Sequence, residues 1–241
     1  MRQGSDQANN LIEAVQLVSE ARIFSYDLLR QTFLQEPDQS YLVTLKDEDI
    51  LRGFPFAEEN HLIQEGISLV THFLDQNASS LDELLDRLRW DYTRLFIGPE
   101  KLPAPPWESV YLSRDGLLFQ KQTMEVRRLY RQFGYVPINY PHEADDHLGL
   151  ELDFLFKLAS RTKEEIDQKK FDPALDLLKE QSSFLEEHLL KWIPSFVEDV
   201  HEAAETSFYQ GLAKILHGYL EQDRIVIDEL AETIRQVSVV C

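Results

Sequence analysis

The sequence from Leu95 to Tyr111 reads Leu-Phe-Ile-Gly-Pro-Glu-Lys-Leu-Pro-Ala-Pro-Pro-Trp-Glu-Ser-Val-Tyr and separates two strongly helical segments. Its prolines each fix their own φ and bias the preceding residue towards an extended backbone, so we expect a stiff, non-helical connection. Such a loop presents Trp107 and Tyr111 at low entropic cost, as peptide-recognition surfaces do. The alternative is a rigid connector whose aromatic side chains pack into the core.

Apolar residues at helical spacing flank this stretch on both sides. On the N-terminal side, Ser80-Leu81-Asp82-Glu83 has the capping-box pattern, and the apolar spacing continues to Phe96 before Gly98-Pro99 stops the helix. On the C-terminal side, the pattern predicts a helix over residues 117–133, closed by Gly134.

The rest of the chain also has helical periodicity. Helices are predicted over residues 9–35 and 58–76, whereas residues 38–57 are mixed, with one short turn near residues 47–51. Residues 143–160 are apolar around most of the circumference, which predicts a central helix. Asp172 before Pro173 is expected to cap a helix that runs to about Trp192.

Pro194 should break or kink that helix, and two or three more helices are expected over residues 195–238. The chain has no alternating strand pattern and no repeats. The predicted fold class is all-α, with about nine or ten helices.

Composition limits the classes of function. The chain has 241 residues, of which 43% are hydrophobic and 28% charged, the profile of a soluble globular protein. Its net charge of −19 disfavours nucleic acid and anionic lipid, but permits a basic peptide partner. Neither a membrane-spanning run nor a secretory signal is recognisable, and the single cysteine, Cys241, fits a reducing cytoplasm.

Two motifs resemble those of the TorD/DmsD family of cytoplasmic molybdoenzyme maturation chaperones. The first, closest to the DmsD branch, is Leu95-Phe96 with Gly98-Pro99, followed by the run from Leu102 to Tyr111. The second, here called the acidic-histidine motif, is Glu143-Ala144-Asp145-Asp146-His147, followed by Leu148-Gly149-Leu150-Glu151-Leu152. The family usually has proline after the glutamate, where this chain has Ala144, a departure that bears on the local turn.

The resemblance implies an all-helical, TorD-like fold in two parts joined by a hinge. The N-terminal part would be residues 1–133, including the proline-rich loop 98–111, the hinge residues 134–142 and the C-terminal part residues 143–241. Family members are monomers or dimers that exchange halves across this hinge, so both oligomeric states stay open.

The resemblance also implies a function. The chain would be a cytoplasmic, non-enzymatic chaperone without a cofactor. It would bind the twin-arginine signal peptide of a molybdopterin-containing oxidoreductase of the DMSO/TMAO reductase type and hold it for cofactor insertion before export, whereas contact with the body of that enzyme stays open. By resemblance, Asp146 and His147 match the pair implicated in signal-peptide recognition, and Glu143 stands beside them. The further candidates for a peptide groove are Leu95, Phe96, Trp107, Ser109 and Tyr111.

Such a groove should combine apolar walls with carboxylates, because arginine pairs with a carboxylate through two parallel hydrogen bonds. We therefore expect the two motifs to converge in space. Simpler readings remain for two sets of residues: the carboxylates favour a helix N-terminus, and Leu95 and Phe96 have the periodicity of core residues.

A carboxylate-bridged metal enzyme in a helical bundle is the main alternative, and a general helical scaffold is a third. The acidic-histidine motif is dense in metal ligands, and Glu143, His147 and Glu151 would share one helix face at four-residue spacing. A di-iron bundle needs Glu-x-x-His on two helices together with further glutamates, and we assign that spacing on one predicted helix, at Glu198 to His201. Walker, dinucleotide and nucleophile-elbow motifs are absent from the sequence, so nothing supplies a cradle for guanine nucleotide.

Overall fold

The computed structural model describes residues 2–46, 48–77, 80–99, 101–113, 117–137 and 143–240. Within these ranges the fold is all-α, as predicted, and contains one isolated β-bridge. The α-helices are α1 (Arg2–Leu34), α2 (Gln39–Lys46), α3 (Glu48–Arg52), α4 (His61–Gln76), α5 (Leu81–Tyr92), α6 (Glu108–Leu112), α7 (Lys121–Gln132), α8 (Leu148–Asp167), α9 (Phe171–Phe184), α10 (Leu190–Ala203) and α11 (Ser207–Val240). Two π-helical segments, η1 (Thr93–Ile97) and η2 (Leu185–Leu189), follow α5 and α9 directly.

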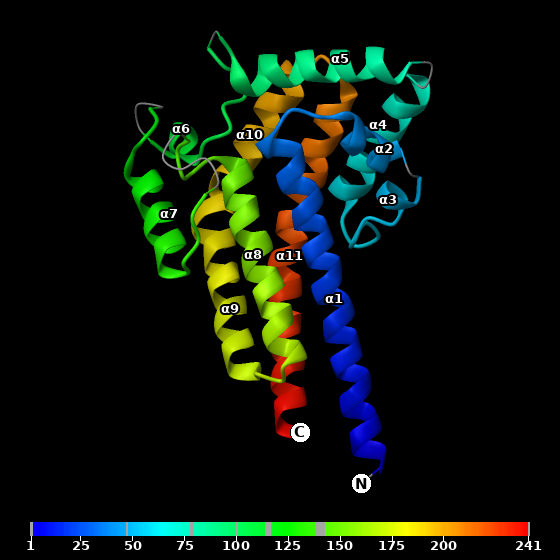
Figure 1. Cartoon of the computed structure of the whole chain (residues 1–241), viewed down its shortest axis with the longest axis vertical. Helices are drawn as coiled ribbons and strands as arrows, with labels where there is room; N and C mark the ends of the chain where they lie inside the picture. The colour runs from blue at the N-terminus through cyan, green and yellow to red at the C-terminus, as the bar shows by residue number, and fades with distance from the viewer. Residues whose placement is uncertain are drawn as a thin grey trace.

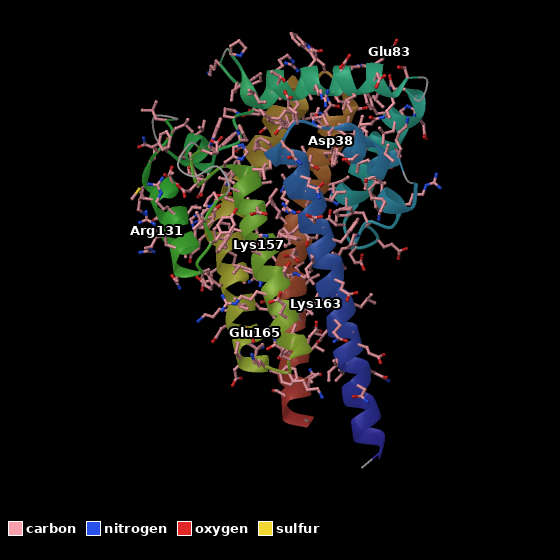
Figure 2. All side chains as sticks on the ribbon, in the orientation of Figure 1. Asp38, Glu83, Arg131, Lys157, Lys163 and Glu165 are labelled. Atoms are coloured by element: carbon pink, nitrogen blue, oxygen red, sulfur yellow. The ribbon has the colours of Figure 1, made fainter. Side chains whose placement is uncertain are left out.

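Long helices form the body of the molecule. In Figure 1, α1, α8, α9 and α11 run alongside one another, while α5 crosses one end of this bundle. Helix α8 is buried around most of its circumference in its N-terminal half, which confirms the prediction of a central helix. On its more exposed side, Lys163 forms ion pairs with Glu20 of α1 and with Asp167 (Figure 2).

Glycines allow two of the helix pairs to approach closely. A Cβ atom on Gly66 of α4 would lie 2.5 Å from the carbonyl oxygen of Gly211 in α11. A Cβ atom on Gly149, at the start of α8, would lie 2.7 Å from the Cα atom of Leu34 at the end of α1. Both contacts are too short for any larger residue, so each glycine sets the distance between two helices.

The start and end of α5 agree with the sequence. Ser80 accepts a hydrogen bond from the amide of Glu83 at 3.3 Å, which confirms the predicted cap. After Tyr92 the helix continues as η1, and it stops at Gly98, whose φ of 94° is readily adopted only by glycine.

Several predicted boundaries were wrong. Residues 39–46 form α2, where only a turn near residues 47–51 was predicted. The expected non-helical connection contains α6, and the helix predicted from residue 117 begins at Lys121. Pro106 precedes α6, and a proline just before a helix is compatible with its first turn, so the prolines end one helix and allow another.

The C-terminal half differs from the prediction in three places. Helix α9 begins at Phe171, so Asp172 lies inside it and is not its cap. Pro194 lies within α10 and does not end it, and the segment that precedes α10 is the π-helix η2. Residues 195–238, where two or three further helices were predicted, contain the end of α10 and one continuous helix, α11.

The predicted division into two parts and a hinge stays a prediction. Residues 138–142 of the proposed hinge, including His142, lie outside the described residues. Helix α1 of the predicted N-terminal part packs against α8 and α11 of the predicted C-terminal part. In the described part of the chain, none of the helices has the length and apolar character that crossing a membrane requires.

Candidate functional site

Main-chain hydrogen bonds join the proline-rich loop to the acidic-histidine motif. The amide of Glu108 donates to the carbonyl of Asp146 at 3.0 Å, and the amide of Leu148 donates to the carbonyl of Pro106 at 2.8 Å. These bonds frame an antiparallel bridge between Trp107 and His147. The two motifs therefore converge in space, as the sequence predicts.

Side chains on the outer side of this junction come from both motifs. The indole Nε1 of Trp107 donates to Glu143 Oε1 at 2.9 Å, and the indole ring meets the His147 ring edge to face with centroids 5.5 Å apart. Trp107 and Glu143 are only partly buried. An aromatic face and a carboxylate are thus accessible side by side.

Asp146 and His147 lie beneath this surface. Asp146 is fully buried, and its Oδ2 accepts a hydrogen bond from the amide of Ser109 at 2.8 Å. His147 is the N-cap of α8, and its Nδ1 accepts a hydrogen bond from the amide of Gly149 at 3.1 Å. Burial lowers the pKa of His147, although the charges of Glu143 and Asp146 oppose that shift. A neutral imidazole can accept the bond from Gly149 through its unprotonated Nδ1. The bond from Ser109 to Asp146 and the bond from Gly149 to His147 therefore stabilise the backbone at the junction.

Ser109 and Tyr111 face the interior of the molecule. Ser109 is fully buried. Tyr111 stacks on Trp192 of α10, with ring centroids 5.3 Å apart, and its hydroxyl donates to Asp199 Oδ2 at 2.9 Å. Burial and the hydrogen bond to Asp199 raise the pKa of Tyr111. Tyr111 anchors α6 to α10.

Leu95 and Phe96 are core residues, as their periodicity indicates. Leu95 is fully buried, and Phe96 has 5% of its surface exposed. The Phe96 ring packs against Phe33 of α1 and Phe196 of α10. Because both side chains are buried, any effect of theirs on a ligand would be indirect.

A small cavity lies next to the acidic-histidine motif. It has a volume of about 100 Å³ and is lined by Arg127, Tyr130, Arg131, Tyr135, Val136, Pro137 and Asp145. Asp145 accepts a hydrogen bond from Arg127 Nε at 2.8 Å, and its carbonyl accepts one from the Tyr130 hydroxyl at 3.0 Å. Arg131 lies on the outer side of α7 (Figure 2). Helix α7 is thereby tied to the motif.

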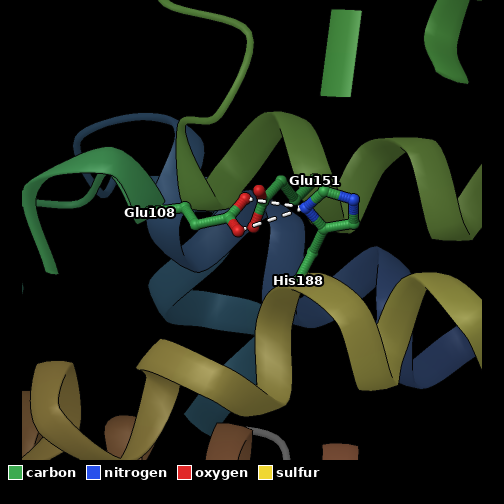
Figure 3. Close-up of side chains that lie close together, drawn as sticks. All are labelled: Glu108, Glu151 and His188. Carbon is green, nitrogen blue, oxygen red and sulfur yellow. Dashed lines mark hydrogen bonds and ion pairs between the residues drawn. The ribbon is translucent and has the colours of Figure 1, made fainter. Parts of the chain in front are cut away.

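The ligands considered for the alternative of a metal enzyme are not arranged as that alternative requires. Helix α8 starts at Leu148, so Glu143 lies outside it and cannot share a helix face with His147 and Glu151. Within the described ranges, the group that could hold a metal ion is instead Glu108, Glu151 and His188 (Figure 3). Glu108 and His188 were not predicted from the sequence as possible metal ligands. The signal that could have found them is a polar side chain at a helix position where the pattern calls for an apolar one.

Comparisons with known proteins agree on one family. Residues 60–198 match the model of the nitrate reductase delta subunit family. The chaperone protein TorD of Vibrio parahaemolyticus is 27% identical over 212 residues, covering 88% of this chain and 97% of that protein. TorD of Vibrio cholerae O395 is 28% identical over 232 residues, covering 92% and 99%.

One solved structure is also similar. It is that of a candidate redox enzyme maturation protein from Archaeoglobus fulgidus, with 22% identity and a TM-score of 0.46. The match covers 84% of this chain and 93% of the other.

Proposed function

Because the chain belongs to the nitrate reductase delta subunit family, which here includes the TorD chaperones, we propose that it is a cytoplasmic maturation chaperone for a molybdopterin-containing oxidoreductase. It would bind the twin-arginine signal peptide of that enzyme and hold the enzyme until its cofactor is inserted, before export. The process is reversible peptide capture without bond breaking. The relatives are named chaperones and not enzymes, which argues against the alternative of a metal enzyme.

One observation supports this proposal most strongly: Trp107 and Glu143, from the two motifs, hydrogen-bond at 2.9 Å on an accessible surface. The Trp107 ring offers an apolar face to the hydrophobic stretch of a leader peptide. Glu143 Oε1 accepts hydrogen bonds from the Trp107 indole and the Ala144 amide, so the Glu143 carboxylate offers chiefly Oε2 to a guanidinium group. A net charge of −19 would speed the approach of a basic peptide.

The buried residues have a different role in this proposal. Asp146 and His147 would fix the backbone of the two motifs and so position Trp107 and Glu143. They would not contact the leader directly, because 0% of Asp146 and 8% of His147 are exposed. Direct contact is therefore assigned to Trp107 and Glu143.

The test is a calorimetric titration of leader peptides from candidate molybdoenzymes. Binding should weaken about tenfold or more when both leader arginines are changed to lysine, because lysine lacks the planar fork that pairs with a carboxylate. Glu143→Gln should weaken binding similarly while keeping an acceptor for Trp107. The control is Glu83→Gln, an exposed acid on α5 (Figure 2).

The outcomes separate the parts of the proposal. If none of the leaders binds, signal-peptide capture is contradicted. If leaders bind and Glu143→Gln and Glu83→Gln behave alike, capture stands and Glu143 is removed from the site.

A further inference from the structure

A compact group of ligating side chains lies directly behind the junction of the two motifs. It consists of Glu108, Glu151 and His188, here called the glutamate–histidine cluster, which are 1%, 0% and 5% exposed. His188 Nδ1 lies 3.1 and 2.9 Å from the two carboxylate oxygens of Glu108. One ligand atom from each residue lies within 4.8 Å of the other two. Figure 3 shows the three side chains pointing towards one another.

Glu151 has unsatisfied hydrogen-bonding capacity in this cluster. Neither of its carboxylate oxygens has a hydrogen-bond partner of ordinary geometry within the described residues, although both are buried. The polar neighbours that Glu151 faces are the Glu108 carboxyl and the Trp192 indole, whose Nε1 also lacks a partner of ordinary geometry in the described part of the chain. A buried, unpaired carboxyl is costly, so a positive ligand would compensate it.

Three separate elements build this arrangement. Glu108 is the first residue of α6, Glu151 lies in the first turn of α8, and His188 lies in the π-helix η2. π-Helical turns are rare and occur frequently at functional sites, because the extra residue changes the direction of the side chains. Residues distant in the sequence are thus brought to one point in the interior.

We propose that Glu108, Glu151 and His188 bind one divalent transition-metal cation, of which Zn²⁺ and Mn²⁺ are the best fits. Two carboxylates and one imidazole are a donor set that such cations accept. In a tetrahedral site with ligand bonds of roughly 2 Å, neighbouring donor atoms lie about 3.3 Å apart, close to the distances between His188 and Glu108. Mg²⁺ would bind more weakly, because it prefers oxygen ligands and retained water.

The role of this cation would be structural. It would neutralise the two carboxylates and fasten α6 to α8 and η2 behind the accessible Trp107. The proposed cation site does not depend on capture of a leader peptide, so its test needs no client protein.

The experiment starts from the full chain, treated with a chelator and dialysed while folded. Titration with ZnCl₂, MnCl₂ and MgCl₂ is followed by calorimetry. We expect one Zn²⁺ or Mn²⁺ per chain in the wild type, with Mg²⁺ much weaker. Glu151→Gln should weaken binding by more than about 100-fold, since even residues that only orient metal ligands cost 10- to 100-fold.

The matched control is Glu221→Gln, which alters another glutamate–histidine pair in the same chain. His217 Nε2 and Glu221 Oε1 are 3.4 Å apart, but Glu221 is half exposed. This variant should bind metal as the wild type does. If Glu221→Gln abolishes binding and Glu151→Gln does not, the metal occupies a surface site and the proposal is overturned.

If Glu151→Gln fails to fold, a measurement on the wild type alone still tests the proposal. The thermal unfolding midpoint should rise with added Zn²⁺ or Mn²⁺ and return to its starting value with excess chelator, because a ligand of the native state stabilises it. Absence of binding and of any shift with both metals would overturn the proposal, leaving the cluster as a buried acid pair beside a histidine.

Discussion

Two clusters of buried polar side chains in this molecule differ in how well they are satisfied. The first, here called the arginine cluster, joins Arg22 and Tyr26 of α1 to Gln181 of α9 and Asp223 of α11. Asp223 accepts hydrogen bonds from Arg22 Nε at 2.6 Å, from Arg22 Nη2 at 3.0 Å and from the Tyr26 hydroxyl at 2.6 Å. The second is the glutamate–histidine cluster, in which both oxygens of Glu151 lack a partner within the described residues.

The balance of charge also differs between the two clusters, and again the arginine cluster is the better satisfied. In the arginine cluster one cation faces one anion: burial alone would lower the pKa of Arg22, but the charge and hydrogen bonds of Asp223 raise it above its usual range. In the glutamate–histidine cluster two acids share one histidine. A cluster that satisfies itself is expected to contribute to specifying the packing of helices, whereas an unbalanced, acid-rich cluster has capacity to bind a cation.

The largest expected effect comes from breaking the arginine cluster. Asp223→Ala would leave the Arg22 guanidinium buried without its counter-charge, and should lower the free energy of unfolding by about 3–5 kcal/mol. Urea denaturation followed by circular dichroism measures this. The control is Asp228→Ala, five residues on in α11, whose carboxylate is 66% exposed. A loss below about 1 kcal/mol for Asp223→Ala would mean that the cluster is not a stabilising element.

The hydrogen bonding of Asp146 is satisfied to a degree between those of the two clusters. Its Oδ2 accepts a hydrogen bond, and its Oδ1 has no partner in the described part of the chain. Asp146→Ala removes the acceptor for the buried amide of Ser109. It should lower the free energy of unfolding by about 1–3 kcal/mol. Denaturant unfolding gives the value, and an unchanged stability would show that this amide finds another acceptor.

The partly buried Tyr111 tests how strongly α6 is attached to α10. Tyr111→Phe keeps the ring on Trp192 and removes only the hydrogen bond to Asp199. We expect a loss of about 0.5–1.5 kcal/mol in thermal or urea unfolding. A larger loss would mean that Asp199 becomes an uncompensated charge when its partner is removed.

The smallest effect is expected from Glu151 in metal-free protein. Burial favours the neutral acid, and Gln is neutral and of nearly the same shape. Glu151→Gln should therefore change the stability of chelator-treated protein by less than about 1 kcal/mol. A loss as large as that of Asp223→Ala would show that the Glu151 carboxyl has a strong partner without metal, and the contrast between the clusters would disappear.

Much of the fold follows from apolar spacing and caps. The helix from Leu81, the buried positions of Leu95 and Phe96 and the central helix after His147 were all predicted from pattern. The continuity of α11 was not, because a polar stretch after Tyr219 interrupts its apolar spacing. Asp223 lies in that stretch and faces the interior, where Arg22 balances it. A partner nearly 200 residues distant cannot be inferred from local periodicity.

The candidate site was predictable in part. The two motifs that meet were recognised, but not which of their residues are accessible. Burial of Asp146 depends on a backbone amide of the other motif, at Ser109. The position of His188 beside Glu108 depends on the π-helical turn η2, and the apolar pattern of the sequence does not specify such a turn. The predicted functional role of the site residues stays a prediction.

The junction between the two motifs is held largely by main-chain atoms, through the amides of Glu108 and Leu148. Amide and carbonyl groups are the same for every residue type except proline, which lacks the N–H. The framework can therefore tolerate exchange of Trp107 and Glu143, the partly exposed side chains it carries. A library randomised at these two positions, screened for folding and for leader binding, would test whether they set the peptide preference proposed above.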